Sequence, residues 1–346
     1  MAHEERPWLL RSSPSMVSVF LTLLAVVPSG MATEKRAVDP FVQNQRLGRG
    51  VNIIGYDPIW NARDKARFKP GYFRMIKEAG FQNVRVNLHA FRHMDQGDNT
   101  LRASWWEVLD WAIENALQSD LMVIVDLHEF GAMGNDPEGN KSRFLAFWRQ
   151  VSERLRDAPD NVVFEILNEP SRKLTAEMWN RYLREALAII RKTNPTRTVI
   201  IGPAGYNSIG GLKDLDLPQE DRNIIVTVHY YSPMDFTHQG ASWAGRQDKV
   251  GVEWTGTAAE MAAIKSDFAK AQAWASQHNR PVFLGEFGVY DKAPMESRTR
   301  YLSFVVGEMK ALNWSWAYWQ FDSDFILYDV ENEKWIEPVR KALIQK

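Results

Sequence analysis

From Gly50 onward the chain repeats one pattern, in which a short apolar run is followed by a longer segment of helical period. Such alternation is typical of repeated strand–helix units around a parallel sheet. Eight runs can be counted: residues 51–54, 84–88, 122–127, 162–167, 198–201, 224–228, 282–284 and 316–319. Because eight parallel strands close a barrel, the sequence predicts an α/β fold with a single (β/α)8 TIM barrel.

Several segments between these runs have the residue spacing of amphipathic helices. Two predicted apolar faces consist of Leu145, Trp148, Val151 and Leu155, and of Trp179, Leu183, Leu187 and Ile190. Ser104 and Glu107 form a capping-box pattern at the start of a helix predicted over 105–117. Residues 233–257 are poor in helical period and rich in Trp, Gly and His, so we expect a long loop there.

The first residues differ in character from the rest of the chain. Residues 16–27 form an apolar run that is preceded by Arg6 and Arg11 and followed by small residues up to Ala32. The run is shorter than the roughly 20 apolar residues of a membrane span, and the pattern is typical of a secretory signal peptide. We therefore expect a cleaved signal peptide over 1–32, a single domain over 33–346, and a secreted or periplasmic location. The alternative is a disordered extension of a cytosolic protein.

Charge and cysteine content exclude several other classes of protein. Lys and Arg total 42 against 43 Asp and Glu, so the chain lacks the basic excess that attracts nucleic acid or anionic membranes. It contains no cysteine, which excludes disulfides and thiolate metal sites. We expect a monomer with neither nucleic acid nor membrane as a partner.

Two glutamates follow predicted strands at positions where catalytic side chains are expected. Glu169 follows the fourth strand in FEILNEP, and Glu286 follows the seventh in VFLGEFG. A parallel barrel brings the C-terminal ends of its strands to one mouth, so these carboxyl groups are expected to meet there. Cleavage of a glycosidic bond needs one carboxyl group to protonate the departing oxygen and a second to attack or support the anomeric carbon. The pair therefore predicts a glycoside hydrolase.

Other polar and aromatic residues reach the same mouth. Arg85, in the second strand, is expected to pair with a carboxylate, because a buried guanidinium without one is costly, and to lower the pKa of a nucleophilic glutamate. His128 ends the third strand, and His229 and Tyr231 end the sixth. Aromatic rings can stack on sugar rings. The candidates for this role, in loops or at strand ends, are Trp60, Trp243, Trp254 and Trp319.

From about Gly50 onward, these motifs resemble glycoside hydrolase family 5, and bacterial endo-β-1,4-glucanases in particular. The motifs are RVNL with Arg85, DLH with His128, FEILNEP with Asn168 and Glu169, VHYY with His229 and Tyr231, GEFG with Glu286, and AYWQF with Trp319. The resemblance implies a retaining double displacement with Glu169 as acid and base and Glu286 as nucleophile. It implies no metal or organic cofactor.

The resemblance also implies roles for the supporting residues. Asn168 would bind the sugar 2-OH, Arg85 and Tyr231 would contact Glu286, His128 and His229 would line the site, and Trp319 would stack under the sugar at the cleaved bond. The sequence departs from the close relatives at two positions. Glu129 stands where a second histidine is common, and Tyr206 stands where a tryptophan is common. Both are candidate subsite residues.

Three alternatives remain open at this point. The substrate of the barrel could be mannan, mixed-linkage glucan or xyloglucan instead of cellulose, since glucan and mannan differ in the orientation of one hydroxyl group. A non-catalytic carbohydrate-binding barrel is a second alternative. A metal-dependent hydrolase is a third, with candidate ligands His89, His93, His128, His229 and His238.

Overall fold

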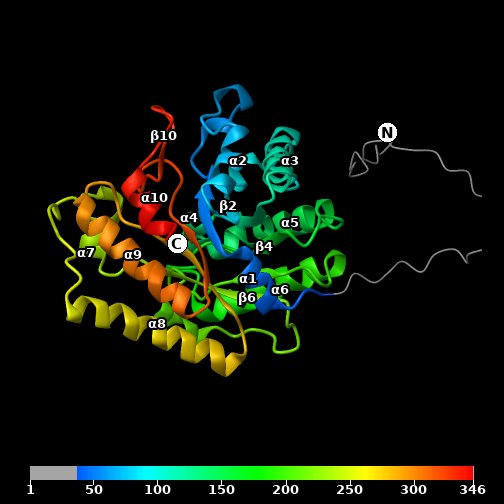
Figure 1. Ribbon diagram of the computed structural model, residues 1–346. Coiled ribbons are helices and arrows are strands. Elements are labelled where there is room, and N and C mark those ends of the chain that lie inside the picture. The colour runs from blue at the N-terminus through cyan, green and yellow to red at the C-terminus, as the bar shows by residue number, and fades with distance from the viewer. Residues whose placement is uncertain (1–36, 346) are drawn as a thin grey trace, which may run out of the picture. The chain divides into compact units, whose positions relative to one another are not determined.

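A computed structural model describes residues 37–345, and the predicted signal peptide lies outside them. The eight predicted runs form a closed parallel barrel in the order β1 to β8, with helices between the strands (Figure 1). The strands are β1 (Arg49–Ile53), β2 (Asn83–Leu88), β3 (Met122–Leu127), β4 (Val162–Glu165), β5 (Val199–Ile201), β6 (Ile224–Tyr230), β7 (Val282–Phe287) and β8 (Ser315–Tyr318). The predicted (β/α)8 fold is confirmed.

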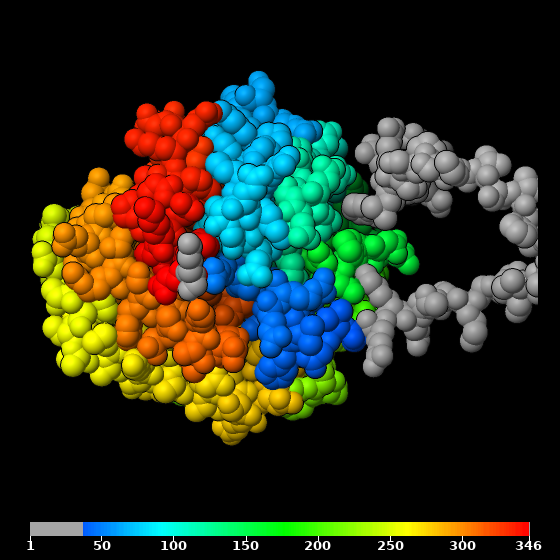
Figure 2. Space-filling view, viewed as in Figure 1, coloured from blue at the N-terminus to red at the C-terminus, as the bar shows by residue number. Residues whose placement is uncertain are grey.

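The helices are α1 (Pro40–Leu47), α2 (Gly71–Glu78), α3 (Ala103–Gln118), α4 (Phe130–Asn135), α5 (Pro137–Arg154), α6 (Ala176–Thr193), α7 (Met234–Thr237), α8 (Ala258–His278), α9 (Met295–Ala311) and α10 (Glu337–Leu343). A short hairpin of β9 (Tyr328–Asp329) and β10 (Lys334–Trp335) follows the barrel and packs on α2, where Tyr72 and Tyr328 have ring centroids 5.3 Å apart. Figure 2 shows this C-terminal segment, in red, beside the light blue α2 region. Within residues 37–345, no helix has the length and apolar content needed to cross a membrane.

The interior of the barrel is apolar at one end and polar at the other. Near the N-terminal ends of the strands, Ile124, Val163 and Phe283 pack with Leu47 of α1 in one buried cluster. Inward positions recur every second residue, so the next inward positions of β3 and β4 hold Asp126 and Glu165, which are fully buried. The polar interior therefore lies at the C-terminal ends of the strands.

The predicted helices exist, but the predicted capping box is wrong. Helix α3 begins at Ala103, and its N-cap residue Arg102 makes no side-chain cap bond. The backbone N–H of Leu101 donates to Gln150 Oε1 at 2.9 Å and that of Arg102 donates to the His93 carbonyl at 3.1 Å. These bonds fix the chain so that the helix starts before Ser104, which then lies within its first turn.

A capping box does form at α8, where Thr257 and Glu260 bond reciprocally to each other's backbone N–H. We expect Thr257→Ala to lower the free energy of unfolding by about 1 kcal/mol, because it removes an acceptor from the first turn of the helix. Urea unfolding followed by circular dichroism measures this change. An unchanged unfolding midpoint would show that the box contributes nothing to stability.

Candidate active site

The two glutamates reach the mouth from different backbone positions. Strand β4 ends at Glu165, so Glu169 lies in the loop beyond it, with a φ of 45°. Glu286 lies inside β7, whereas the sequence placed it after the strand. The pairing register between β6 and β7 shifts between Val228 and His229, and this irregularity sets His229 opposite Glu286.

The two carboxyl groups face one histidine. His229 Nδ1 lies 2.9 Å from Glu169 Oε1 and 3.6 Å from Glu286 Oε2. One carboxylate oxygen of each glutamate and one ring nitrogen of His229 all lie within 4.8 Å of one another. Retaining glycosidases hold their two carboxyl groups roughly 5 to 5.5 Å apart, whereas inverting enzymes hold them roughly 6.5 to 9.5 Å apart to admit a water. The observed spacing suits direct attack by one carboxylate.

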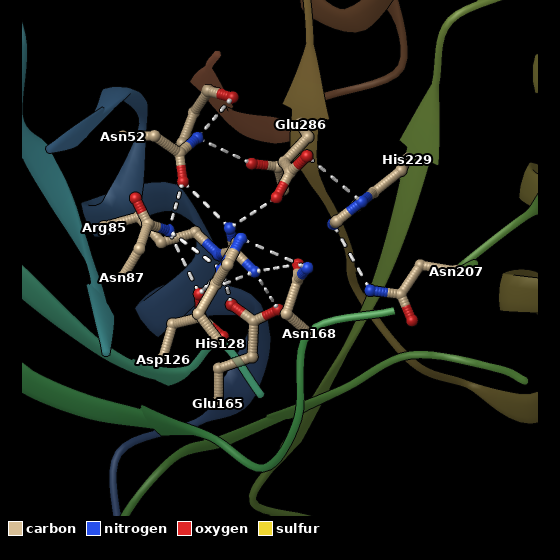
Figure 3. Close-up of polar contacts among 12 residues, drawn as sticks. Asn52, Arg85, Asn87, Asp126, His128, Glu165, Asn168, Asn207, His229 and Glu286 are labelled. Atoms are coloured by element: carbon tan, nitrogen blue, oxygen red, sulfur yellow. Dashed lines mark hydrogen bonds and ion pairs between the residues drawn. The ribbon is translucent and has the colours of Figure 1, made fainter. Parts of the chain in front are cut away.

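Glu286 is the better stabilised of the two as an anion. Arg85 Nη1 donates to its Oε1 at 2.9 Å, and the Tyr231 hydroxyl donates to its Oε2 at 3.1 Å (Figure 3 shows the Arg85 contact). Burial raises the pKa of Glu286 to about 7, and the neighbouring His229 ring and the charge of Arg85 oppose that rise. The predicted contacts from Arg85 and Tyr231 are therefore present in the geometry, although burial outweighs them.

Glu169 lacks a direct cationic partner. Burial raises the pKa of Glu169 to about 8, with Arg85 lowering it from a distance and Asp126 raising it further. Glu169 therefore keeps its proton to a higher pH than Glu286. A protonated carboxyl group beside a carboxylate is the arrangement that an acid and a nucleophile require.

His229 is held in one orientation by its neighbours. Burial lowers the pKa of His229, so the ring is neutral near pH 7. Asn207 Nδ2 lies 3.3 Å from His229 Nε2 and can only donate, which leaves the ring proton on Nδ1, facing Glu169. A side chain at Gly285 would collide with this arrangement, because its Cβ would lie 2.6 Å from Thr227 Oγ1 and 3.0 Å from His229 Nε2.

Arg85 is fully buried at the centre of a polar network (Figure 3). It donates two bonds to Glu165, at 2.7 and 2.8 Å, and lies 3.1 Å from Asp126. It also donates to Asn52 Oδ1 and Asn168 Oδ1, each at 2.8 Å. These bonds fix the orientation of the guanidinium and therefore the position of Nη1, which donates to Glu286.

The other side of the mouth is a stack of rings. The rings of His128 and Trp319 are nearly parallel, with an interplanar angle of 9° and centroids 5.4 Å apart. His128 Nδ1 lies 2.7 Å from Asp126 Oδ2, and burial lowers the pKa of His128, so the neutral ring donates to that carboxylate. Tyr56 meets the edge of Trp319 at 6.3 Å, and His89 lies 5.1 Å from His128.

The candidate subsite residues have different surroundings. Tyr206 and Trp243 are 46% and 58% exposed, so their rings are available to a sugar. Glu129 is partly buried and accepts a bond of 2.6 Å from the Phe91 N–H, and burial raises the pKa of Glu129 to about 7.

Two tryptophans proposed as sugar platforms are core residues, so these predictions are wrong. Trp254 is 1% exposed and packs against Tyr301 and Phe304 of α9. Trp60 is 4% exposed, stacks on Trp105 and donates to the Ile54 carbonyl at 2.6 Å. The long loop and the segment after β1 fold back onto the helices, which sequence spacing does not reveal.

The five histidines proposed as metal ligands do not gather at one point. His93 accepts from Arg92, His238 packs on Tyr231, and His89 and His128 meet edge to face. Among residues 37–345, the three ligand-type side chains that converge are Glu169, His229 and Glu286. Their closest contact, 2.9 Å, is a hydrogen bond between the histidine and the acid.

Several residues of this site were missed in the sequence. Asn52, Asn87, Asp126, Glu165 and Asn207 all belong to the polar network (Figure 3). For the residues on strands, the signal was their alternation with apolar residues, as in RGVNI, VIVDL and VVFE.

Known proteins share this architecture. The family model described as "Cellulase (glycosyl hydrolase family 5)" matches residues 46–325. Curated relatives include Endoglucanase H of Acetivibrio thermocellus, 28% identical over 99% of this chain, and Endoglucanase 3 of Fibrobacter succinogenes, 25% identical over 86%. The chain spans 39% and 52% of the lengths of these two relatives.

Solved structures resemble the whole barrel. Endoglucanase Cel5A of Thermotoga maritima is 40% identical, with a TM-score of 0.84 over 89% of this chain and 100% of that one. Cellulose synthase subunit Z of Clostridioides difficile is 35% identical, with a TM-score of 0.82 over 86% of this chain and 100% of that one. With the family model matching most of its length, the chain belongs to glycoside hydrolase family 5, the cellulase family.

Proposed function

We propose that the chain is a retaining endo-β-1,4-glucanase that hydrolyses cellulose, carboxymethylcellulose and mixed-linkage β-glucan without a metal or organic cofactor. The observation that carries this proposal is the pair Glu169 and Glu286, whose oxygens approach within 4.8 Å while only Glu286 receives bonds from Arg85 and Tyr231. The names of the curated relatives support the substrate.

The geometry supports a double displacement. Glu286 attacks the anomeric carbon as the bond to the leaving oxygen breaks, and Glu169 gives its proton to that oxygen. Glu169, now a carboxylate, takes a proton from water, and that water displaces Glu286 from the sugar. Arg85 and the Tyr231 hydroxyl hold the Glu286 oxygens, while Trp319 supports the sugar ring and Asn168, by the family resemblance, binds its 2-OH.

Mannan is the second candidate substrate. Thermotoga maritima Cel5A, 40% identical to this chain, has been solved both with cellobiose and with mannotriose. An endo-β-1,4-mannanase, or one enzyme for both polymers, is therefore compatible with the same pair of glutamates.

Reducing-sugar release from four polymers in parallel tests these assignments. We expect strong release from carboxymethylcellulose and barley β-glucan, weaker release from glucomannan, and none from the Glu286→Ala control. Release from galactomannan alone would contradict the glucanase proposal and assign the substrate to mannan. A lack of release from every polymer would instead favour the non-catalytic carbohydrate-binding barrel.

The two raised pKa values predict a narrow pH profile. We expect kcat/KM to rise as Glu286 ionises near pH 7 and to fall as Glu169 loses its proton near pH 8, because attack needs a carboxylate and departure needs an acid. Because the two carboxyl groups interact, the two apparent pKa values of this profile describe the pair and not either glutamate alone. On barley β-glucan, whose leaving oxygen needs a proton, Glu169→Gln should be much slower than the wild type, keep the acidic limb and lose the alkaline one. An alkaline limb that survives in this variant would contradict the assignment.

We also propose that the chain is exported to the periplasm or the medium, and that the enzyme is a monomer. The apolar run in residues 16–27 supports export. N-terminal sequencing of the protein from culture fractions and its mass in solution test the two proposals.

A further inference from the structure

The rim of the mouth beside Glu169 contains a cluster of strained backbone positions. Glu169, Arg172, Tyr206 and Asn207 have φ values of 45°, 59°, 64° and 53°, in the left-handed region that non-glycine residues rarely adopt. All four lie in the loops that follow β4 and β5. Strained conformations that the surrounding structure holds in place gather at sites of function. Glu169 and Asn207 already belong to the catalytic network, whereas Arg172 and Tyr206 do not.

Arg172 and Tyr206 are held together directly beside the acid. The N–H groups of Gly205 and Tyr206 donate to the Pro170 carbonyl at 2.8 and 3.2 Å. Arg172 Nε donates to the Tyr206 hydroxyl at 3.4 Å, and its Nη1 donates to Asn135 Oδ1 at 2.8 Å. The strained backbone thus presents a tyrosine and a guanidinium at one place on the rim.

The charge of Arg172 is not neutralised by its surroundings. Arg172 is exposed, and within residues 37–345 no carboxylate lies within ion-pair distance of it. Arg85, by contrast, contacts Glu165, Asp126 and Glu286. Arg172 Nη2 has no partner in the described part of the chain, so one edge of the guanidinium is free to donate.

The position of this pair identifies the sugar that it would meet. In the proposed reaction Glu169 protonates the leaving oxygen, so the leaving sugar lies on the Glu169 side of the cleaved bond. Pro170, next to Glu169, accepts the bonds from the Gly205 and Tyr206 N–H groups, so the loops after β4 and β5 meet on that side. The leaving sugar therefore extends over the loops after β4 and β5. Tyr206, 46% exposed, offers a ring to that sugar.

We propose that Arg172 and Tyr206 form an aglycone subsite that accepts a sugar bearing a carboxylate group within a β-1,4-linked polysaccharide. A guanidinium matches a carboxylate with two parallel N–H bonds, and both bonding partners that fix Arg172 are neutral. This inference rests on the proposed hydrolase function, and it narrows that function to polymers with acidic substituents in the leaving part.

Three soluble substrates separate recognition of a carboxylate from recognition of the glucan chain. They are neutral hydroxyethylcellulose, carboxymethylcellulose, and oxidised cellulose with glucuronic acid units. We expect Arg172→Gln to lower kcat/KM on the two acidic polymers about two- to fivefold more than on hydroxyethylcellulose, the range of an exposed ion pair. The difference should shrink as salt is raised to about 1 M. An effect on carboxymethylcellulose alone would support the subsite and locate the carboxylate on a flexible substituent.

The matched control is Arg181→Gln, which removes an exposed arginine from α6, outside the site. It should leave the ratio between acidic and neutral substrates at the wild-type value. Tyr206→Ala should weaken hydrolysis of all three polymers alike. If Arg172→Gln lowered kcat/KM equally on all three polymers, the carboxylate subsite would be overturned and the hydrolase function would stand. An inactive wild-type enzyme would overturn both proposals.

Discussion

Glu286→Ala is expected to lower kcat by a factor on the order of 10⁴ to 10⁶, because the first displacement loses its nucleophile. Azide is small enough to enter the space that the carboxylate leaves and can attack the anomeric carbon from the same face. Only one displacement then occurs, so the glycosyl azide should have the inverted, α configuration. Chromatography and NMR of the product formed from an activated aryl cellobioside measure both the rescue and its stereochemistry.

The variant should still fold, which keeps this test informative. Arg85 retains its two bonds to Glu165 and its contact with Asp126 after the Glu286 carboxylate is removed. The thermal midpoint can be compared with that of Glu177→Ala, which removes an exposed glutamate from α6. A folded Glu286→Ala protein that azide does not rescue, or a β-configured azide product, would count against the nucleophile assignment.

The fold was predictable because its signal is local and repeated. Each strand of the barrel is a short apolar run, and the predicted range for β3 coincides with the observed one. The errors arose where tertiary contacts set the outcome. The bonds of Leu101 and Arg102 move the start of α3, and the irregular pairing at His229 extends β7 past Glu286. Neither contact has a counterpart in residue spacing.

The site was predictable only in part, for a similar reason. Glu169 and His229 stand out because they follow predicted apolar runs in the sequence. The buried Asp126 and Glu165, which contact Arg85, lie deeper in the barrel, on the strands and inside the predicted apolar runs. A buried Arg85 requires nearby carboxylates. The inward positions of the neighbouring strands are where such carboxylates are expected. The exposure of a tryptophan depends on how its loop folds back, so Trp243 and Trp254 could not be distinguished.

Glu169→Ala is expected to produce a different pattern, in which the loss depends on the leaving group. With cellulose derivatives the leaving oxygen needs a proton, so kcat/KM should fall by a factor on the order of 10² to 10⁴. A dinitrophenolate leaves without protonation, so kcat/KM on a dinitrophenyl cellobioside should stay near the wild-type value. Its kcat should nevertheless fall, because no base then activates the water that releases Glu286, and the glycosyl-enzyme should accumulate as a burst.

Azide separates the two roles most sharply. In Glu169→Ala the intermediate on Glu286 still forms, and azide, which needs no base, attacks it from the opposite face. The product should therefore be the β-glycosyl azide, the anomer opposite to that from Glu286→Ala, because two displacements occur instead of one. Equal losses of kcat/KM on activated and natural substrates would contradict the acid role of Glu169. The α anomer from both variants would show that the two carboxyl groups do not divide the reaction as their surroundings indicate.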